Sequence, residues 1–388
     1  MRIAVINLTG GGLSGGYRKY LLKLASVFNR DPILSDSVFF VHEALRGMKG
    51  LENLNLQTWP RRDHLFGYRQ LKASLRRLKP DVIFIPSARW FKLDEVPTVV
   101  MVRNMEPLEV PFGKNPLVEK IKNVGRAWEA KKACRQATRV LAVSKHVKNF
   151  LVSRWRISPD KIDVIYHGID CPSDMPSDNK PTRLKALPQK FIFTAGSIRP
   201  ARGLEDLMDA LQILAGRGRR PSVVVAGGVD AGMDFYKRTL DDISKRAGVY
   251  DQVIWAGPLS PAEMAWCYSK CEIFVMTTHA EACPNTALEA MSYGCRCVVT
   301  DKEPLPEFFL DSAWFYNARS GTSLAEQLMK ALDCDAPTSE RMQSKAKVRA
   351  SEFKWEETIR ATITKLALAR SSSGASSAGQ FAQDQGAR

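Results

Sequence analysis

Short apolar runs alternate with amphipathic segments along the first half of the chain. The apolar runs occupy residues 2–8, 38–41, 82–86, 98–102 and 139–144. Between several of them the apolar residues recur at helical spacing, as in YRKYLLKLASVF after the first run. Buried strands of a parallel sheet read as short, continuous apolar runs, because both faces of the sheet are covered. The alternation therefore predicts an α/β fold, with a parallel sheet and helices on both faces.

A second series of the same kind begins at residue 191. Its apolar runs occupy residues 191–197, 222–228, 252–257, 272–278 and 296–301. Residues 171–190, between the two series, are rich in Pro, Asp and Ser and predict a hinge or linker. We therefore expect two Rossmann-like domains, residues 1–170 and residues 191–352, whose parallel sheets face a central cleft. Ligands of open α/β sheets bind beyond the carboxyl ends of the strands.

The chain changes character after the second series. Residues 353–370 have the spacing of one amphipathic helix, which we expect to pack back toward the N-terminal domain. Residues 371–388 are rich in Ser, Gly, Ala and Gln. Such a segment buries too little apolar surface to order itself, so a disordered tail is expected there.

The length and the charge of the chain narrow the functional classes. A chain of 388 residues favours two domains over one core. Its net charge of +16 indicates an anionic partner, which could be a nucleotide, a phosphorylated substrate, a membrane surface or a nucleic acid. No recognised nucleic-acid-binding motif is present, so nucleic acid is not expected as a partner.

The basic residues are dense between Lys114 and Lys148, where ten Lys or Arg stand against two Glu. Val118, Ile121, Val124 and Trp128 recur there at helical spacing and predict a side of the helix that faces the core. The charged side is either a solvated surface or a surface that attracts anionic lipid or a phosphorylated acceptor.

Three features predict a cytoplasmic protein. The apolar run in MRIAVINLTGGG is too short for a signal peptide, and no run approaches the 18 apolar residues of a membrane span. The eight cysteines are scattered without C-x-x-C spacing, so we expect them to be reduced.

Two glycine-rich loops follow apolar runs. In TGGGLSGG, residues Gly10, Gly12 and Gly15 fit G-x-G-x-x-G, which lets backbone N–H groups approach a phosphate at a helix N-terminus. Tyr17 stands where a Walker loop needs Lys, and a tight turn would satisfy the same pattern. A NAD-binding interpretation would need an acidic residue after the second run, for which Glu43 is the best candidate.

The second loop, GSIRPARG, holds Arg199 and Arg202 between a predicted strand and a predicted helix. Two guanidinium groups beside a helix N-terminus can bind a diphosphate through paired hydrogen bonds. A solvated basic turn is the alternative interpretation.

The stretch HAEACPNTALEAMSYG carries two glutamates eight positions apart. Glu281 falls in a predicted loop and Glu289 in a predicted helix, so both can point along one elongated ligand. Asn285 is a candidate N-cap, which would leave N–H groups of the first turn free for a phosphate.

Taken together, these segments resemble the retaining glycosyltransferases of family 4, the group 1 glycosyltransferases, whose GT-B fold has two Rossmann-like domains. The resemblance covers nearly the whole chain except the tail. It rests on the segments GGYRKYLLKLA, LKPDVIFI, RVLAVSKHVKNFLVSRW, DVIYHGID, the GS…RGL loop, VVVAGG, IWAGPLSPAEMAWCYSKCEIFVMTT and EACPNTALEAMSYGCRCVVTD.

The resemblance implies an N-terminal acceptor domain and a C-terminal donor domain. It implies that a hexose moves from a nucleotide diphosphate sugar, a UDP- or GDP-sugar, to a glycan or lipid-linked acceptor with retention. No cofactor or metal ion is implied. Such chemistry suits the synthesis of cell-surface polysaccharide, lipopolysaccharide or glycolipid, on the inner face of the cytoplasmic membrane.

The resemblance also implies roles for individual residues. Glu281 would meet the hydroxyl groups of the donor sugar, Glu289 the ribose, and Arg202 and Arg199 the leaving diphosphate. Further donor contacts are implied for Gly196, Ser197, Gly227, Gly257, Pro284, Asn285 and Thr286. The N-terminal loop would contribute Gly12, Gly15 and Gly16, and the acceptor side Arg103 and Asn104.

The sequence departs from the family pattern at three places. Ser197 stands where the family often has Arg, and Arg199 is the candidate to replace it. Arg103 and Asn104 occupy a region where many members have His, and His167 begins the hinge motif where Asn is usual. Asp333-Cys334-Asp335 has D-x-D form but lies far from the motifs, so we expect no metal there.

Three other classes remain as alternatives. A nucleotide-sugar epimerase or hydrolase of the same fold would turn over without an acceptor. A NAD-linked oxidoreductase would need phosphate loops in only one Rossmann unit, whereas two are present. A catalytically inactive binding protein is disfavoured by the intact Glu281 and Glu289.

Overall fold

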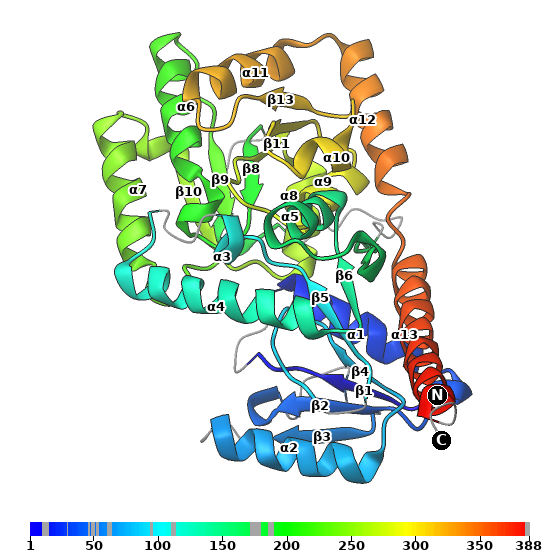
Figure 1. Cartoon of the computed structure of the whole chain (residues 1–388). Helices are drawn as coiled ribbons and strands as arrows, with labels where there is room; N and C mark the ends of the chain where they lie inside the picture. Colours follow the sequence, from blue (N-terminus) through cyan, green and yellow to red (C-terminus); the bar gives the residue numbers. More distant parts are fainter. Residues whose placement is uncertain are drawn as a thin grey trace. The chain divides into compact units, whose positions relative to one another are not determined.

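A computed structural model describes residues 1–9, 15–28, 30–45, 47, 51, 54–59, 64–93, 96–109, 114–170, 180–184 and 190–384. The chain divides into two compact units (Figure 1). The first unit comprises Met1–Arg103, Gly125–Gly168 and the chain from Trp355 onward, and the second comprises Asn104–Val124 and Ile169–Lys354. Most of the predicted hinge, 171–190, lies outside the described residues.

The described part of the first unit contains a seven-stranded parallel sheet of order β3-β2-β1-β4-β5-β6-β7. The central strands are fully buried on both faces, as their continuous apolar runs predicted. The strands are β1 (Ile3–Ile6), β2 (Val38–His42), β3 (Leu56–Trp59), β4 (Val82–Ile85), β5 (Thr98–Val102), β6 (Arg139–Ala142) and β7 (Ile162–Val164). The helices around this sheet are α1 (Gly15–Phe28), α2 (His64–Leu78), α5 (Lys145–Trp155), α13 (Trp355–Asp384) and α4 (Leu117–Gln136), of which the residues up to Val124 belong to the second unit.

The described part of the second unit contains a six-stranded parallel sheet of order β10-β9-β8-β11-β12-β13. Its strands are β8 (Ile192–Ala195), β9 (Val223–Ala226), β10 (Val253–Gly257), β11 (Ile273–Met276), β12 (Cys297–Thr300) and β13 (Trp314–Tyr316). The helices are α3 (Glu106–Glu109), α6 (Leu204–Gly216), α7 (Asp234–Arg246), α8 (Pro261–Lys270), α9 (Asn285–Ser292), α10 (Leu305–Phe309), α11 (Gly321–Asp333) and α12 (Ala336–Ala350). Leucines of α6 pack with β8, β9 and α11 in one core. The predicted class, two α/β units with parallel sheets, is confirmed.

Three strands were absent from the apolar runs of the sequence-based prediction. The strands β3, β7 and β13 each lie at an edge of their sheet, so they are covered less than the central strands. In β3 the side chains of Gln57 and Thr58 are exposed, and β7 and β13 each have two half-buried residues. Because an edge strand needs no continuous apolar run, none of these segments stood out in the sequence.

The last helix, α13, begins at Trp355 and packs within the first unit. Thr358 donates to the carbonyl oxygen of Tyr166 at 2.8 Å, and Lys365 pairs with Asp163 at 2.9 Å. The predicted disordered tail differs from the structure, in which α13 continues to Asp384. Once a helix is nucleated, each further residue adds one backbone hydrogen bond, so α13 runs on into a segment that has little apolar surface to bury.

The face of α4 that the sequence predicted to be buried is exposed in the structure. Val118, Ile121, Val124 and Trp128 were predicted to face the core, but all four side chains are exposed. The buried side consists instead of small and polar residues, namely Asn123, Ala130, Ala133 and Cys134. Small side chains let a helix approach its neighbours closely, so the large apolar residues did not mark the packed face. No helix of the described residues is long and apolar enough to cross a membrane.

His167 is buried in the first unit between two aromatic rings. It stacks on Tyr20 and Trp355, with ring centroids 5.4 Å and 6.0 Å away. Neither ring nitrogen has a hydrogen-bond partner within the described structure. Burial lowers the pKa of His167 to about 3, and the charge of Arg103 acts in the same direction. The imidazole is therefore neutral in the folded protein.

We predict that His167 makes the protein less stable in mild acid. The unfolded chain binds a proton at this residue below its unfolded pKa of about 6.5, whereas the folded chain does so only below about 3. Between these values the unfolding free energy falls as the pH falls, by up to about 1.4 kcal/mol per pH unit from this group. His167→Phe keeps an aromatic ring in the stack and should reduce that slope. Urea unfolding of both proteins at pH 7 and pH 5 measures it, and equal slopes would contradict the prediction.

Candidate active site at the strand ends of the second sheet

The candidate site lies where the strand order of the second sheet reverses. The strand β8 is flanked by β9 on one side and β11 on the other, so the chain winds away from β8 in both directions. At such a point the loops that follow the two neighbouring strands separate and leave a crevice at the carboxyl edge. The two loops here span residues 196–203 and 277–284, and they carry most of the predicted donor residues.

Three neighbouring strands end in a glycine at this edge. Gly196, Gly227 and Gly257 follow or end β8, β9 and β10, and their φ angles are +145°, +140° and +65°. The N–H of Gly196 donates to Ala226 and that of Gly227 donates to Gly257, both at 2.9 Å. A Cβ atom at Gly227 would lie 1.9 Å from the carbonyl oxygen of Gly196. The backbones approach so closely that a side chain has no room at Gly227.

The loop after β11 holds the loop after β8. Thr277 donates its hydroxyl to the carbonyl oxygen of Arg202 at 2.7 Å, and the hydroxyl of Thr278 is shared between the carbonyl oxygens of Ala201 at 3.2 Å and Ala280 at 3.0 Å. The N–H of His279 also donates to Ala201, at 2.8 Å. A Cβ atom at Gly203 would lie 2.4 Å from the carbonyl oxygen of Thr277, so the two loops are in close contact. Their mutual position is thereby fixed.

This arrangement brings Arg202 and Glu281 together. The Nη1 atom of Arg202 lies 3.1 Å from Oε2 of Glu281, and both side chains are largely buried. The guanidinium also lies against Gly196, where a Cβ atom would be 2.7 Å from its Nε. Burial raises the pKa of the Glu281 carboxyl above its usual range, whereas Arg202 and the N–H groups of Ala282 and Cys283 act to lower it. The pair places a cation and a hydrogen-bond acceptor side by side at the crevice.

Glu289 is the fifth residue of α9, in the second turn of the helix. Its Oε2 atom accepts a hydrogen bond from the hydroxyl of Tyr268 at 3.2 Å. Burial raises the pKa of Tyr268, and the charge of Glu289 raises it further, so Tyr268 stays a hydrogen-bond donor. Tyr268 also stacks on Tyr293, with ring centroids 5.5 Å apart. The sequence had not singled out Tyr268, because its place on α8 gives no local sign of this contact.

The start of α9 differs from the expectation for Asn285. The N-cap is Pro284, without a side-chain capping bond, and Asn285 is the first helical residue. The Asn285 Oδ1 atom accepts from the Cys283 thiol at 3.5 Å, and its N–H donates to the Cys283 carbonyl at 2.9 Å. As the first helical residue, Asn285 lies one position past the one from which a side chain caps the N–H groups of the first turn. Thr286 donates to the carbonyl oxygen of Ala195 at 3.4 Å, which ties α9 to the end of β8.

Arg199 does not join the Arg202–Glu281 pair. Its guanidinium contacts three carboxylates of the second unit: Glu106 at 2.9 Å, Asp230 at 2.9 Å and Glu119 at 3.8 Å. Burial raises the pKa of Glu106, and the charge of Arg199 opposes this shift. These partners are distant in sequence, and the sequence analysis missed them. Ser197, the neighbour expected to matter with Arg199, is half-buried between Gly196 and Ile198.

The remaining predicted residues lie elsewhere. In the first unit, the Arg103 guanidinium is 3.8 Å from the ring centre of Tyr17, whose hydroxyl donates to Asn7 at 2.9 Å. In the second unit, Asn104 accepts from the N–H of Glu106 at 3.1 Å at the start of α3. Gly15 and Gly16 are the first residues of α1, and Gly12 lies outside the described residues.

The two aspartates of Asp333-Cys334-Asp335 make contacts that stabilise the fold. Asp333 pairs with Arg219 at 2.6 Å, and Asp335 accepts from the N–H of Thr338 at 3.0 Å as the N-cap of α12.

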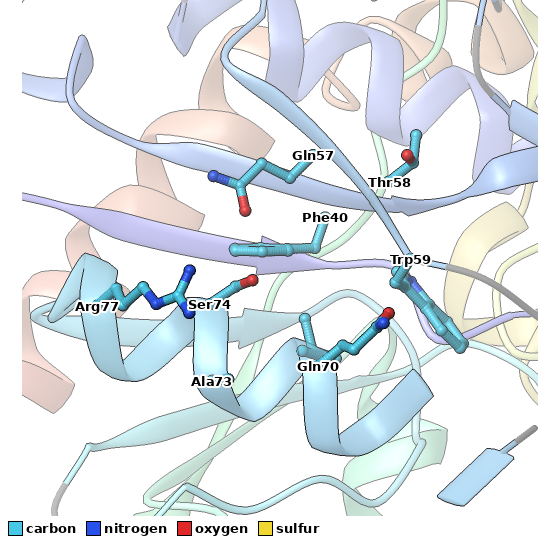
Figure 2. Close-up of a pocket in the computed structure, with 9 residues that line it drawn as sticks. Phe40, Gln57, Thr58, Trp59, Gln70, Ala73, Ser74 and Arg77 are labelled. Carbon is cyan, nitrogen blue, oxygen red and sulfur yellow. The ribbon is translucent and has the colours of Figure 1, made fainter. Parts of the chain in front are cut away.

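The first unit has a cavity of about 220 Å³ between α2 and the β2–β3 edge of its sheet (Figure 2). Amide, hydroxyl and guanidinium groups of Gln57, Ser74 and Arg77 extend into the space beside Phe40. None of the predicted site residues lines this cavity. It is lined by Phe40, Gln57, Thr58, Trp59, Gln70, Leu71, Ala73, Ser74 and Arg77.

Two family models match the chain. The model described as Glycosyltransferase Family 4 matches residues 41–172, and the model described as Glycosyl transferases group 1 matches residues 177–349. Among curated proteins, D-inositol 3-phosphate glycosyltransferase of Gordonia bronchialis is 27% identical over 252 residues, which cover 61% of this chain and 54% of that protein. The chain thus spans about half the length of the curated relatives it matches.

Solved structures show the same arrangement of strands and helices. HepE of Anabaena, in complex with UDP and glucose, superimposes with a TM-score of 0.74 at 15% identity, over 95% of this chain and 100% of that one. WaaG, a glycosyltransferase involved in lipopolysaccharide biosynthesis, has a TM-score of 0.68 at 14% identity, over 94% of this chain and 99% of that one. At these identities the likeness concerns the fold alone.

The glycine edge generates a prediction about stability. Gly227→Ala places a methyl group on a backbone carbonyl and at a φ of +140°, so the edge must shift. We expect a loss of about 2–4 kcal/mol in the free energy of unfolding. Gly216→Ala is the matched control, because nothing lies within 4 Å of a Cβ atom there at the end of α6. Denaturant unfolding compares the two, and equal effects would contradict the steric argument.

Proposed function

This chain belongs to the group 1 glycosyltransferases and has the GT-B fold, and we propose that it transfers a hexose from a UDP- or GDP-sugar to a glycan or lipid-linked acceptor hydroxyl with retention. The observation that carries the proposal is the Arg202–Glu281 pair at the strand-order reversal, with Glu289 on the helix that follows. A reversal point is where open α/β sheets bind their ligands.

We propose that three residues bind successive groups of a nucleotide sugar. Glu281 accepts hydrogen bonds from the hydroxyl groups of the hexose, since a carboxylate can bind a diol. Arg202 binds the diphosphate, because a guanidinium matches phosphate oxygens in geometry and charge. Glu289 accepts hydrogen bonds from the ribose hydroxyls. Because Gly196, Gly227 and Gly257 have no side chains, nothing would project from these strand ends against the diphosphate.

In the proposed reaction the acceptor oxygen attacks the anomeric carbon on the face from which the leaving group departs. The bond between that carbon and the phosphate oxygen breaks, and the acceptor proton passes to the departing phosphate. The products are the glycoside and a nucleoside diphosphate. Negative charge grows on the leaving group, and the guanidinium of Arg202 stabilises it. Its positive charge takes the role that a metal ion would otherwise have. We therefore propose that no metal ion or other cofactor takes part.

Arg202 carries more of this role than Arg199 in our proposal. In the part of the chain that the structure describes, Arg202 has one carboxylate beside it and Arg199 has three, so less of the positive charge of Arg199 remains for a phosphate. We propose that Arg199 positions the loop after β8 by binding Glu106 and Asp230.

The donor and acceptor classes have separate support. UDP is the first nucleotide to test, because the similar structure of HepE holds it. An anionic or lipid-linked acceptor suits the net charge of +16, and so does work on the inner face of the cytoplasmic membrane. A role in cell-surface polysaccharide, lipopolysaccharide or glycolipid synthesis follows from that acceptor class.

A donor screen tests the proposal. We expect a UDP- or GDP-sugar to raise the melting temperature, since a ligand at one hundred times its Kd stabilises the fold by about 2.7 kcal/mol. Glu289→Ala should weaken binding of the nucleoside diphosphate by about 1.5–3 kcal/mol, because the ribose loses a charged acceptor. Measurement is by thermal shift and titration calorimetry, with and without EDTA. Unchanged affinity in Glu289→Ala would remove this residue from the ribose site, and a need for metal would contradict the metal-free proposal.

Release of nucleoside diphosphate should require an acceptor. Release at the same rate without any acceptor would instead favour a hydrolase, and interconversion of the donor sugar would favour an epimerase.

The two arginines should respond differently to substitution. We expect Arg202→Ala to lower kcat/KM by about 100-fold or more, as for loss of one charge-stabilising donor. Arg202→Lys keeps a positive charge beside Glu281 and controls for loss of folding, but lacks the planar fork and should recover only part of the activity. Arg199→Ala leaves Glu106 buried without its cation, so the melting temperature should fall more than kcat/KM does. Near-normal kcat/KM in Arg202→Ala would remove Arg202 from the site.

A further inference from the structure

The cavity between α2 and the β2–β3 edge lies on one face of the first sheet (Figure 2). Phe40 and Gln57 are paired on neighbouring strands, and Trp59 follows Gln57 by two residues, so all three point to the same face. Phe40 is the third residue of β2, before the carboxyl end of that strand. Open α/β sheets bind their principal ligands beyond the carboxyl ends of the strands, so a ligand in this cavity would occupy a second, separate site.

Gln57 is polar on a face where packing alone selects apolar side chains. A sheet face that a helix covers is ordinarily lined by apolar residues, as it is at Phe40 and Trp59, which are 2% and 4% exposed. The side chain of Gln57 is exposed, and it has no hydrogen bond to another residue in the described ranges. Its amide extends into the cavity (Figure 2). The amide can therefore bind a ligand there.

Helix α2 directs three more polar side chains toward the same space. Gln70, Ser74 and Arg77 follow one another at steps of four and three residues, so they share one side of the helix, and all three line the cavity. A cation in the last turn of a helix often binds the free carbonyl groups of that turn, but here the carbonyl oxygen of Leu78 accepts from Arg2 at 2.7 Å. The Arg77 guanidinium has no ion pair with a described residue and extends into the cavity (Figure 2).

The indole of Trp59 forms a fixed wall of the cavity. Its Nε1 donates to the carbonyl oxygen of Asn7 at 3.3 Å. His42 packs edge-to-face on the indole, with ring centroids 5.6 Å apart, and the ring of Tyr68 lies 6.1 Å from it. A wall held by several contacts needs little reordering when a ligand binds, which favours affinity.

The charge around the cavity favours an anion. Helix α2 contains Arg69, Lys72, Arg76 and Arg77 and no acidic residue. Of these cations Arg77 lines the cavity, and its neighbour Arg76 does not. A guanidinium binds a carboxylate or a phosphate through two parallel hydrogen bonds. The expected ligand therefore carries one such group.

The other groups in the cavity indicate what carries the anion. An amide both donates and accepts hydrogen bonds, as a hydroxyl group does, so Gln57 and Gln70 match a polyhydroxylated ligand. The rings of Phe40 and Trp59 offer apolar surface to its C–H groups. The volume of about 220 Å³ equals that of about seven water molecules at about 30 Å³ each. It is below the range of about 300–1,000 Å³ that is usual for drug-sized ligands, so one sugar ring fits the space better than a nucleotide.

We propose that this cavity binds one monosaccharide unit that carries a phosphate or carboxylate group. The Arg77 guanidinium holds the anionic group, and the amides of Gln57 and Gln70 hold ring hydroxyls. A free sugar phosphate and one residue of an anionic glycan present this same chemistry. None of the donor-site residues lines the cavity, so the proposal goes beyond the proposed function and does not rest on it.

Titration calorimetry on the whole chain at about 0.15 M salt tests the site with glucose 6-phosphate, galacturonate, glucose and inorganic phosphate. The two anionic sugars should bind. Glucose and phosphate should each bind at least about tenfold more weakly, because each lacks part of the match. Arg77→Gln should weaken binding of both anionic sugars by about tenfold or more, since a charged hydrogen-bond pair is lost, and it should leave the weak binding of glucose unchanged.

Arg76→Gln is the matched control. It removes the same charge from the same turn of α2, but Arg76 does not line the cavity, so the affinity should stay within about twofold of that of the wild type. Ser74→Leu fills the cavity from the helix and should weaken the binding of every sugar. A trimer of galacturonate identifies the source of the ligand. Tighter binding than the monomer assigns the site to a glycan, tightest binding of glucose 6-phosphate assigns it to a free sugar phosphate, and both results support the site.

Several results would overturn the proposal. They are absence of binding by either anionic sugar at millimolar concentration, equal loss of affinity in Arg77→Gln and Arg76→Gln, and inorganic phosphate binding as tightly as glucose 6-phosphate. Affinity unchanged in both Arg77→Gln and Ser74→Leu would place the sugar elsewhere and also refute the site. Melting temperatures check that each variant is folded. UDP binding, measured on the same samples, should be unchanged, so loss of sugar binding alone refutes this site and failure to bind UDP alone refutes the proposed function.

Discussion

The hydrogen bonds from Thr277 and Thr278 to the carbonyl groups of Arg202 and Ala201 are the contacts on which the candidate site depends. They join two loops that leave the sheet in opposite directions and are separated by more than seventy residues of chain, since Arg202 and Glu281 are 79 positions apart. Both donors are buried at the end of β11, so their partners cannot be exchanged for water without cost. The cation and the carboxylate meet because the backbone beneath them is held in this way.

Arg202 and Arg199 lie in the same loop but differ in the number of carboxylates around them. Among the described residues one carboxylate, that of Glu281, pairs with Arg202, and burial raises the pKa of that carboxyl. Arg199 is surrounded by Glu106, Glu119 and Asp230, which bind it from several directions. Two residues three positions apart in one loop therefore differ in what they can do. Local sequence could not show this difference, because it depends on acids supplied by α3, α4 and the loop after β9.

The sequence predicted most of the fold and part of the site, and the reasons lie in particular residues. Continuous apolar runs identified the central strands, whereas the edge strand β3, with exposed Gln57 and Thr58, carried too weak a pattern. Glu281 and Glu289 stood out because their spacing recurs in a known family, but Tyr268 and Glu106 depend on long-range packing. On α4 the large apolar residues suggested the wrong side, since Ala130, Ala133 and Cys134 make the packed face. Periodicity locates an amphipathic face, and it does not say whether protein or another medium covers that face.

The glycine edge of the second sheet implies a division of labour in recognition. Gly196, Gly227 and Gly257 present only main-chain groups, and every nucleoside diphosphate offers the same phosphates to them. In the proposed function this edge cannot distinguish uridine from guanosine or one hexose from another. Discrimination must then come from side chains on the surrounding loops, which can vary without disturbing the strand ends. A change of donor preference would thus be sought by redesigning those loops, while the glycines are left untouched.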